Sequence, residues 1–190
     1  MSHRLVCIMG PSGVGKDSVL AALRAQWPDA ERAHWVRRSI TRPATAGGEA
    51  HEALDRPSFD FLRDTGAFAL HWEAHGLGYG IRWAELAPLT TGRWVFLNGS
   101  RAHWSAVRHR WPQATLVHIT APAEVLAQRL AARGRESAAE IAARLARAEA
   151  WPLPPDAVTV HNTGLLQDAA TNLQRALQAL DAQASTALPA

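Results

Sequence analysis

The stretch "GPSGVGKDS", Gly10 to Ser18, decides the fold class of this chain. It fits the phosphate-loop pattern G-x-x-x-x-G-K, in which backbone N–H groups at the start of a helix bind the phosphates of a nucleotide. An apolar run, Leu5 to Met9, comes directly before it, and apolar residues at helical spacing follow over 17–27. Strand, glycine-rich loop and helix in this order are the context that the motif requires. We therefore interpret the stretch as a nucleotide site rather than as a glycine-rich turn without a ligand.

The motif predicts which residues bind the phosphates of ATP: Gly10, Pro11, Ser12, Gly13, Val14, Gly15, Lys16, Asp17 and Ser18. Lys16 is the single lysine among the 20 Lys and Arg residues of the chain. A compact ammonium group fits between the β- and γ-phosphates, where a planar guanidinium would not. We therefore expect Lys16 to act in catalysis.

The position after Lys16 departs from the pattern. The motif calls for Ser or Thr, whose hydroxyl holds Mg²⁺, but this chain has Asp17, with a hydroxyl one place later at Ser18. Mg²⁺ prefers hard oxygen ligands and often takes carboxylates, so Asp17 is a candidate metal ligand. The alternative is an aspartate at a helix start that the helix dipole stabilises by roughly 0.3–1 kcal/mol.

Composition indicates one soluble globular domain over 1–190. The chain has 190 residues, of which 47% are hydrophobic and 19% charged. No apolar run reaches the roughly 20 residues that a membrane helix needs, and we expect no signal peptide before the first strand-like run. The single Cys7 cannot form an internal disulfide, which favours the cytoplasm. The net charge is +3, but the arginines are spread along the chain, so we expect no nucleic-acid partner.

Hydrophobic periodicity predicts an α/β fold, in which a parallel sheet is flanked by helices. Strands are expected at 5–9, 34–40, 94–99, 115–120 and 156–162, with a hairpin at 67–81. Helices are expected at 17–27, 58–66, 101–111, 123–134, 136–150 and 165–180, with a loop at 41–57 and a frayed tail at 181–190. Gly10, Arg38, Asn98 and Asn162 follow strands, so they should converge on one edge of the sheet.

Two further stretches are rich in arginine. In "QRLAARGRESAAEIAARLARA", Arg129 and Arg133 share a helix face and Gly134 separates them from Arg135 and Arg144. We interpret this as a lid whose arginines close over the transferred phosphoryl group. The alternative is an exposed helix surface with ion pairs.

In "VRRSITRP", Arg37 and Arg38 should face opposite ways on a strand, so only one of them can point into the site. With Arg42 it would grip a second phosphate, which predicts an acceptor that is itself phosphorylated. The alternative is surface arginine. His71 and His75 would not share a face on a strand and turn, and we predict no zinc site.

The order of these motifs resembles the guanylate kinase-like family over nearly the whole chain. The phosphate loop, S-x-T-R, "GE", an aromatic hairpin ending "YG", the "RGRE" lid and the late "N-x-G" carry the resemblance. The positions that read guanine in that family differ, with His71 in "FALHW" and Ile81 after "YG". The departures are similar to a narrower group, the ribose 1,5-bisphosphate phosphokinases, through "GPSGxGKDS", "RRxITRP", "GExH" and "NGSR".

The resemblance implies a P-loop kinase with a core at about 4–40 and 92–181, a small β region that binds the acceptor at about 41–91, and a helical lid at about 133–145. It implies that ATP with Mg²⁺ phosphorylates ribose 1,5-bisphosphate to 5-phosphoribosyl 1-diphosphate, in phosphonate breakdown. The implied catalytic residues are Lys16, Arg129, Arg133, Arg135 and Arg144, and Asn162 joins the ATP site. The candidate acceptor-binding residues are Arg38, Thr41, Arg42, Glu49, His51, His71, Tyr79, Asn98, Ser100 and Arg101.

Two other functions stay open: a nucleoside monophosphate kinase, and a catalytically inactive binding module of the same fold. A homodimer also stays open. Related kinases have a hydroxyl in the loop and a carboxylate after the middle strand, whereas this chain has Asp17 in the loop and Asn98 after the strand. We therefore expect that the negative charge has moved from one position to the other.

Overall fold

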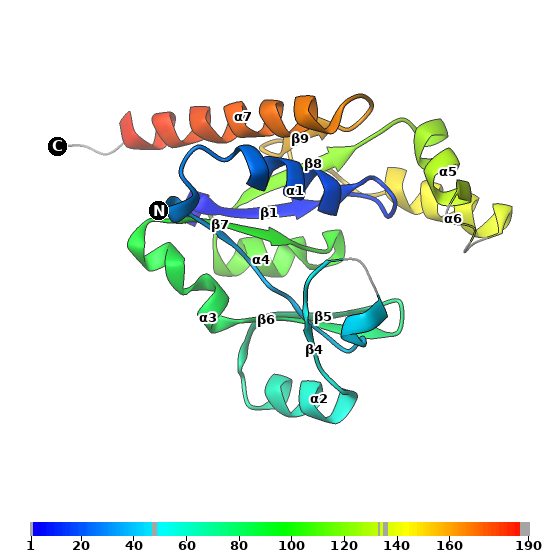
Figure 1. Ribbon diagram of the computed structural model, residues 1–190, viewed down its shortest axis with the longest axis horizontal. Coiled ribbons are helices and arrows are strands. Elements are labelled where there is room, and N and C mark those ends of the chain that lie inside the picture. The colour runs from blue at the N-terminus through cyan, green and yellow to red at the C-terminus, as the bar shows by residue number, and fades with distance from the viewer. Residues whose placement is uncertain (1, 47–48, 133, 135–136, 187–190) are drawn as a thin grey trace.

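The larger body of the molecule is built on a parallel sheet (Figure 1). A computed structural model describes residues 2–46, 49–132, 134 and 137–186. The sheet has five strands, and each neighbouring pair is parallel. In spatial order the strands are β2 (Ala33–Trp35), β7 (Trp94–Asn98), β1 (Leu5–Met9), β8 (Thr115–Thr120) and β9 (Val158–His161). The predicted parallel core sheet is thereby confirmed.

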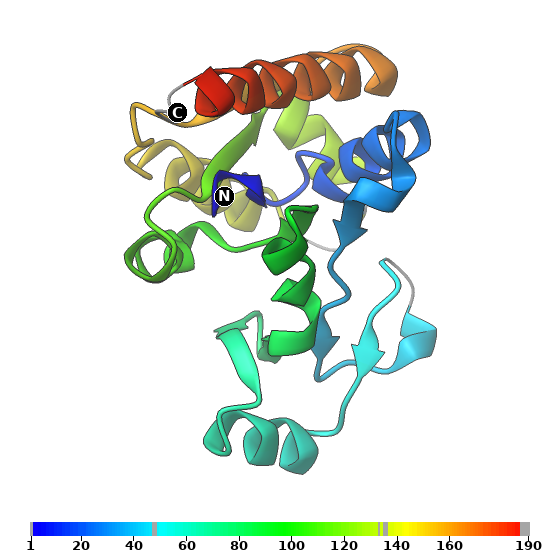
Figure 2. The ribbon, with the colours of Figure 1, turned by 90° about the vertical axis from the view of Figure 1, so that its left-hand side faces the viewer.

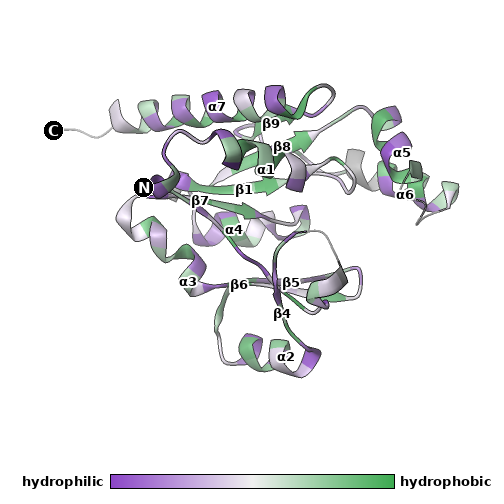
Figure 3. Cartoon of the chain, viewed as in Figure 1, coloured by the Kyte–Doolittle hydropathy of each residue, from purple (hydrophilic) through white to green (hydrophobic). Residues whose placement is uncertain are grey.

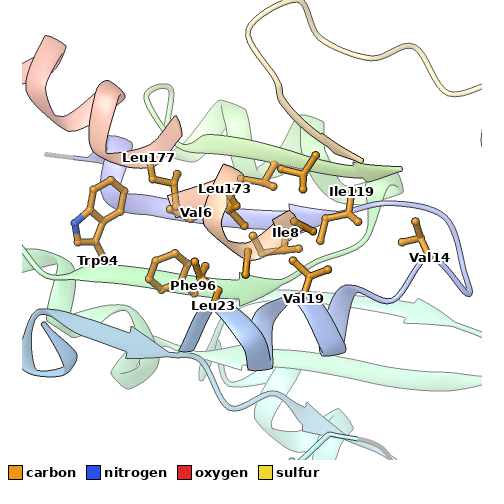
Figure 4. Packing of buried hydrophobic residues seen from close by; sticks show 14 of the residues in the cluster. Val6, Ile8, Val14, Val19, Leu23, Trp94, Phe96, Ile119, Leu173 and Leu177 are labelled. Atoms are coloured by element: carbon orange, nitrogen blue, oxygen red, sulfur yellow. The ribbon is translucent and has the colours of Figure 1, made fainter. Parts of the chain in front are cut away.

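One face of this sheet is covered by α1 (Lys16–Gln26) and α7 (Leu166–Thr186). Every residue of β1 is buried, and Figure 3 shows this strand as hydrophobic along its length. Figure 4 shows how Val6 and Ile8 point toward Leu23 of α1 and toward Leu173 of α7. This packing fixes the start of α1, and with it the phosphate loop, at the carboxyl edge of the sheet.

The opposite face packs on α4 (Trp104–Arg110) and on a second, smaller sheet. Cys7 and Met9 of β1 meet Trp104 of α4 and Trp72 of the smaller sheet in one buried cluster. Burial raises the pKa of the Cys7 thiol far above its usual range, so this cysteine is an inert core residue. The shared cluster holds the two sheets together.

The smaller sheet contains, in spatial order, β4 (Glu52–Ala53), β3 (Ser39–Ile40), β6 (Leu77–Arg82) and β5 (Phe68–Ala74). It lies below the larger body in the views of Figures 1 and 2. The helix α2 (Arg56–Asp64) packs on its outer face. On that face a Cβ atom at Gly80 would lie 2.5 Å from the ring of Phe68, so only glycine fits there.

The prediction of one strand over 34–40 is wrong. The chain leaves the larger sheet after β2 and enters the smaller one at β3, and 36–38 belong to neither. The Glu85 carboxylate accepts hydrogen bonds from His34 Nε2 at 2.7 Å and from the backbone N–H of Arg37 at 2.9 Å, which fixes this crossing. The expected alternation of Arg37 and Arg38 on a strand therefore does not apply.

Other boundaries also differ from the prediction. The expected loop at 41–57 contains η3 (Ala44–Ala46), β4 and the first turn of α2, which Asp55 caps. The expected frayed tail is helical as far as Thr186. The helix predicted at 101–111 divides into η5 (Arg101–His103) and α4. The short helices that the prediction omitted are η1 (Ser2–Arg4), η2 (Ala30–Arg32), α3 (Trp83–Leu86) and η4 (Ala87–Thr91).

Two helices project beyond the carboxyl edge of the larger sheet, α5 (Ala123–Ala132) and α6 (Ala138–Glu149) (Figure 1). Ser137 and Glu140 form a capping box that starts α6. The lid was predicted at about 133–145, a range that α6 covers in part and that α5 precedes. In the described parts of the chain, none of the helices combines the length and the apolar character that crossing a bilayer requires.

Candidate active site

The phosphate loop connects β1 to α1 and is shaped by glycines. Gly13 and Gly15 have φ angles of 86° and 90°, which side chains rarely tolerate. A Cβ atom at Gly13 would lie 2.9 Å from Leu130, and one at Gly15 would lie 2.7 Å from Asn162 Nδ2. The loop is therefore closely surrounded by α5 and by the end of β9.

Lys16 reaches back across this loop. Its Nζ donates hydrogen bonds to the carbonyl oxygens of Gly10 at 3.1 Å and Pro11 at 3.2 Å. The ammonium group is thus held over the hollow of the loop, where the backbone N–H groups make an anion site. A bound triphosphate would draw Lys16 from these carbonyl oxygens to phosphate oxygens, which are the stronger acceptors.

Two predicted residues hold the Val14 carbonyl group. Asn162 Nδ2 donates to this oxygen at 2.7 Å, and Arg129 Nη1 donates to it at 3.3 Å. Asn162 is 2% exposed, and its Oδ1 has no hydrogen-bond partner among the described residues. These two side chains position the loop, and the Asn162 carboxamide oxygen has capacity to accept a bond from a ligand.

Arg144 brings the lid to the phosphate loop. Its Nη1 donates a hydrogen bond of 2.9 Å to Ser12 Oγ, although the two residues lie on α6 and at the start of the loop. Arg129 and Arg144 thus contact the loop from α5 and α6, respectively. Arg133 and Arg135, which were also predicted to act in catalysis, lie outside the described residues.

Asp17 and Asn98 are in direct contact. Asn98 Nδ2, at the end of β7, donates a hydrogen bond to Asp17 Oδ1 in the first turn of α1. Asn98 is 7% exposed, and its own Oδ1 is buried without a hydrogen-bond partner in the part of the chain that the structure describes. Oxygen atoms of a carboxylate, a carboxamide and the adjacent Ser18 hydroxyl are a donor set that suits Mg²⁺.

Arg38 connects the smaller sheet to this pair. Its Nη1 donates to the Asn98 carbonyl oxygen at 3.2 Å, and its Nε donates to Glu49 Oε1 at 2.8 Å. The guanidinium carbon lies 5.1 Å from the ring centre of Tyr79, which is stacked on Trp72. A cation held by a carboxylate and an aromatic face is pre-positioned to bind a phosphate.

Arg42 and His51 form a second contact on the same sheet. The His51 ring lies between two carbonyl oxygens, with Nε2 3.0 Å from that of Arg42 and Nδ1 3.0 Å from that of Glu49, and Nδ1 also lies 3.4 Å from Arg42 Nη2. Thr41 instead has a structural role, because its Oγ1 accepts a 2.8 Å bond from the N–H of Gly78 on β6. The structure therefore gathers Arg38, Arg42, Glu49 and His51 around β3 and β4.

The structure does not bring every candidate to this group. His71 pairs with Gly80, whose Cβ direction leads to Phe68 on the α2 face, so His71 lies on that outer face. Ser100 and Arg101 follow β7 near Asn98, and the Arg101 guanidinium carbon lies 5.6 Å from the ring centre of Trp151. Arg101 thus lies beside a tryptophan that the sequence analysis did not select.

His118 and Trp151 are the residues near the site that the sequence analysis missed. His118 interrupts the apolar strand "TLVHIT", and a histidine inside such a strand is the signal that could have found it. Trp151 lies in the turn-rich segment after α6, where nothing in the pattern marks it. Across the described ranges, no three His, Cys, Asp or Glu side chains cluster as a metal site.

This chain is similar to known proteins over most of its length. The family model for guanylate kinase matches residues 2–180. A protein of Burkholderia pseudomallei named ribose 1,5-bisphosphate phosphokinase PhnN is 44% identical over 181 residues, which cover 94% of this chain and 97% of that protein. A protein of the same name from Agrobacterium fabrum is 41% identical, covering 92% of this chain and 96% of its own.

Two other comparisons are with a much longer protein and with a solved structure of low sequence identity. A bifunctional ribose 1,5-bisphosphokinase-thymidine phosphorylase of Azorhizobium caulinodans is 50% identical over 80% of this chain, and this chain spans 22% of its length. The crystal structure of guanylate kinase from Anaplasma phagocytophilum superposes with a TM-score of 0.69 at 19% identity, covering 92% of this chain and 84% of that one. The latter shows a shared fold. By its family model and its full-length relatives, this chain belongs to the guanylate kinase family and, within it, to the ribose 1,5-bisphosphate phosphokinases.

Proposed function

We propose that the protein transfers the γ-phosphoryl group of ATP to the 1-phosphate of ribose 1,5-bisphosphate, giving ADP and 5-phosphoribosyl 1-diphosphate. The observation that carries this proposal is the 44% identity with a ribose 1,5-bisphosphate phosphokinase over 94% of the chain. The reaction would serve phosphonate breakdown in the cytoplasm.

The transfer needs positioning and charge neutralisation rather than a general base. An oxygen of the acceptor 1-phosphate attacks the γ-phosphorus, and the bond to the β-phosphate oxygen breaks as ADP leaves. Because the attacking oxygen is already ionised, no side chain has to remove a proton. Lys16 and Arg144, which both contact the phosphate loop, would neutralise the charge on the transferring group.

The acceptor would bind between the two sheets. Arg38 lies in the crossing between the two sheets and donates to the Asn98 carbonyl oxygen, so it would stand between the phosphate loop and the acceptor. Arg38 and Arg42 would hold the 1-phosphate in line with the γ-phosphate. Glu49 and His51 orient these two arginines through the bonds described above.

The contact between Asp17 and Asn98 supports a role for Mg²⁺ with ATP. Asp17 would hold the ion, directly or through water, and the buried Asn98 Oδ1 would complete the oxygen ligands or bind their water. When bound, Mg²⁺ neutralises charge on the β- and γ-phosphates.

A comparison of acceptors tests the proposal. The rate of ADP formation is measured with Mg-ATP and either ribose 1,5-bisphosphate or GMP, and kcat/KM is determined for each. We expect the bisphosphate to be preferred by at least about 10²-fold, because a site without guanine-reading groups leaves the polar edges of a base unpaired. A preference for GMP would instead assign the protein as a nucleoside monophosphate kinase, and no ADP from either acceptor would indicate a binding module.

A further inference from the structure

A cavity of about 270 Å³ lies beside the phosphate loop, and the roles assigned so far do not use it. Its wall includes the loop itself, the end of β8, both lid helices and the segment after α6, through Pro11, His118, Thr120, Leu126, Leu145 and Trp151. The Pro11 carbonyl oxygen accepts a hydrogen bond from Lys16, so the cavity adjoins the place where phosphoryl transfer would occur.

His118 brings unused hydrogen-bonding capacity to this cavity. Both of its ring nitrogens are buried, and neither has a hydrogen-bond partner among the residues that the structure describes. A buried polar group that is left unpaired has a free-energy cost. The ring centre lies 5.7 Å from that of Trp151, with 53° between the planes. A ligand in the cavity that bonds to His118 would recover that cost.

The surroundings of His118 favour an anion. Burial lowers the pKa of His118, and the positive charges of Arg101, His161 and Lys16 lower it further. Arg101 is itself half-buried against Trp151, and burial lowers the pKa of its guanidinium group. Among the described residues that line the cavity, none carries a carboxylate.

We propose that this cavity binds the ribosyl 5-phosphate end of the acceptor. The sugar packs against Trp151, and the 5-phosphate accepts a hydrogen bond from His118 in the positive field of Arg101. The inference rests on the proposed function and extends it, because it names the subsite that selects a sugar bisphosphate.

Two observations favour the acceptor over the nucleotide as the occupant. At about 270 Å³ the cavity is below the roughly 300–1,000 Å³ of sites for drug-sized ligands, which suits a sugar phosphate better than a nucleotide. Val14, which Asn162 and Arg129 hold, belongs to the buried cluster on the α1 and α7 face, whereas Trp151 packs against the cluster on the other face. The Trp151 end of the cavity is therefore on the face of the smaller sheet, whereas Leu126 and Leu145 in the same wall pack on the α1 and α7 side.

The test compares two acceptors that differ only in the 5-phosphate, ribose 1,5-bisphosphate and ribose 1-phosphate. In the full chain we expect kcat/KM for the bisphosphate to exceed that for the monophosphate by roughly 10- to 100-fold, the effect of a hydrogen bond to a charged group. His118→Ala should reduce this ratio about tenfold by slowing the bisphosphate reaction alone, and His118→Gln, which keeps a donor, should restore part of it. His109→Gln, on an exposed position of α4, is the matched control and should leave the ratio unchanged.

Other results would overturn the inference. Equal losses with both acceptors in His118→Ala would indicate a structural role, and a raised KM for ATP with an unchanged ratio would assign the cavity to the donor. If His118→Ala does not fold, calorimetry with the full chain replaces it: ribose 5-phosphate should bind in competition with the bisphosphate, and absence of binding contradicts the proposal. No turnover of ribose 1,5-bisphosphate by the unaltered chain would instead remove the proposed function itself.

Discussion

Asp17 is the residue at which this chain departs most from the phosphate-loop pattern. The structure pairs its carboxylate with the Asn98 carboxamide, which comes from the neighbouring strand β7. The carboxylate in the loop and the neutral amide after the strand together carry one negative charge. A neutral side chain in the loop with a carboxylate after the strand would carry the same charge. Asp17 follows Lys16 directly and the Asn98 carbonyl oxygen accepts a hydrogen bond from Arg38, so the pair connects the phosphate loop to the crossing between the two sheets.

We predict that Asp17→Ser raises the Mg²⁺ concentration for half-maximal rate about tenfold, which corresponds to about 1.4 kcal/mol of lost binding. The physical reason is the loss of a negative oxygen ligand. Rates over a Mg²⁺ series, and calorimetric binding of Mg-ADP, measure the effect.

The matched variant for this prediction is the double substitution Asp17→Ser with Asn98→Asp, which returns the charge from the opposite side. It should recover much of the Mg²⁺ affinity. Unchanged Mg²⁺ dependence in Asp17→Ser would leave Asp17 only as a residue stabilised by the helix dipole.

At the scale of elements, the two lid helices reach the loop through arginines that point at different atoms of it. Arg129 on α5 bonds to the Val14 carbonyl oxygen, and Arg144 on α6 bonds to the Ser12 hydroxyl. The first contact positions the loop. The second involves a neutral side chain that a phosphate oxygen can readily replace as the partner of the guanidinium group.

We predict that Arg144→Ala lowers kcat at least about 10²-fold while changing the KM for the acceptor little, because the charge it neutralises develops in the transition state. Steady-state kinetics with ribose 1,5-bisphosphate measure this. Arg175→Ala, an exposed arginine on α7, is the control. A kcat within twofold of the unaltered protein would show that Arg144 has no part in the transfer.

The hairpin of β5 and β6 depends on Gly80, which leaves room for the ring of Phe68. We predict that Gly80→Ala lowers the free energy of unfolding by about 1–3 kcal/mol, because the added methyl group would overlap a buried ring. Urea unfolding measures it. Gly164→Ala meets nothing within 4 Å and should be nearly neutral, and equal effects of the two substitutions would contradict the account.

The centre of the larger sheet was predictable from the sequence because β1 and β7 are short, fully buried and mostly apolar runs between recognisable helices. The crossing at 36–38 was not, because its direction depends on Glu85, which lies far along the chain and holds His34 and Arg37. The phosphate loop and the arginines were found from motif spacing. The orientation of His71 and the cavity at Trp151 depend on which sheet face a residue occupies and on tertiary packing, which spacing alone does not give.

At the scale of the whole molecule, the first and last helical segments are joined at the edge of the larger sheet opposite the phosphate loop. Arg4 donates two hydrogen bonds of 2.8 Å to the Asp181 carboxylate, and the His3 ring lies 2.9 Å from the same group. Arg4 and Asp181 are separated by nearly the full chain. Their contact therefore links the residue directly before β1 to α7 and stabilises the packing of this helix.

We predict that Asp181→Asn lowers the free energy of unfolding by about 1–3 kcal/mol at neutral pH. Arg4 and His3 lower the pKa of the Asp181 carboxyl in the folded state, so its contribution is complete above the unfolded pKa of about 3.9 and is lost as the pH falls through the folded value. Urea unfolding should therefore show the full difference between the two proteins at about pH 5, and a shrinking one below about pH 4. A difference that grows as the pH falls below about 4 would contradict this.

The central claim is that the two sheets and the lid form one site that converts a sugar bisphosphate into a sugar with a diphosphate at C1. Phosphorus NMR of a reaction with Mg-ATP and ribose 1,5-bisphosphate tests it most directly. We expect a new pair of coupled diphosphate signals, one of them also coupled to the C1 proton, with the 5-phosphate signal retained. Formation of ADP and free phosphate without that pair, or a diphosphate at C5, would contradict it.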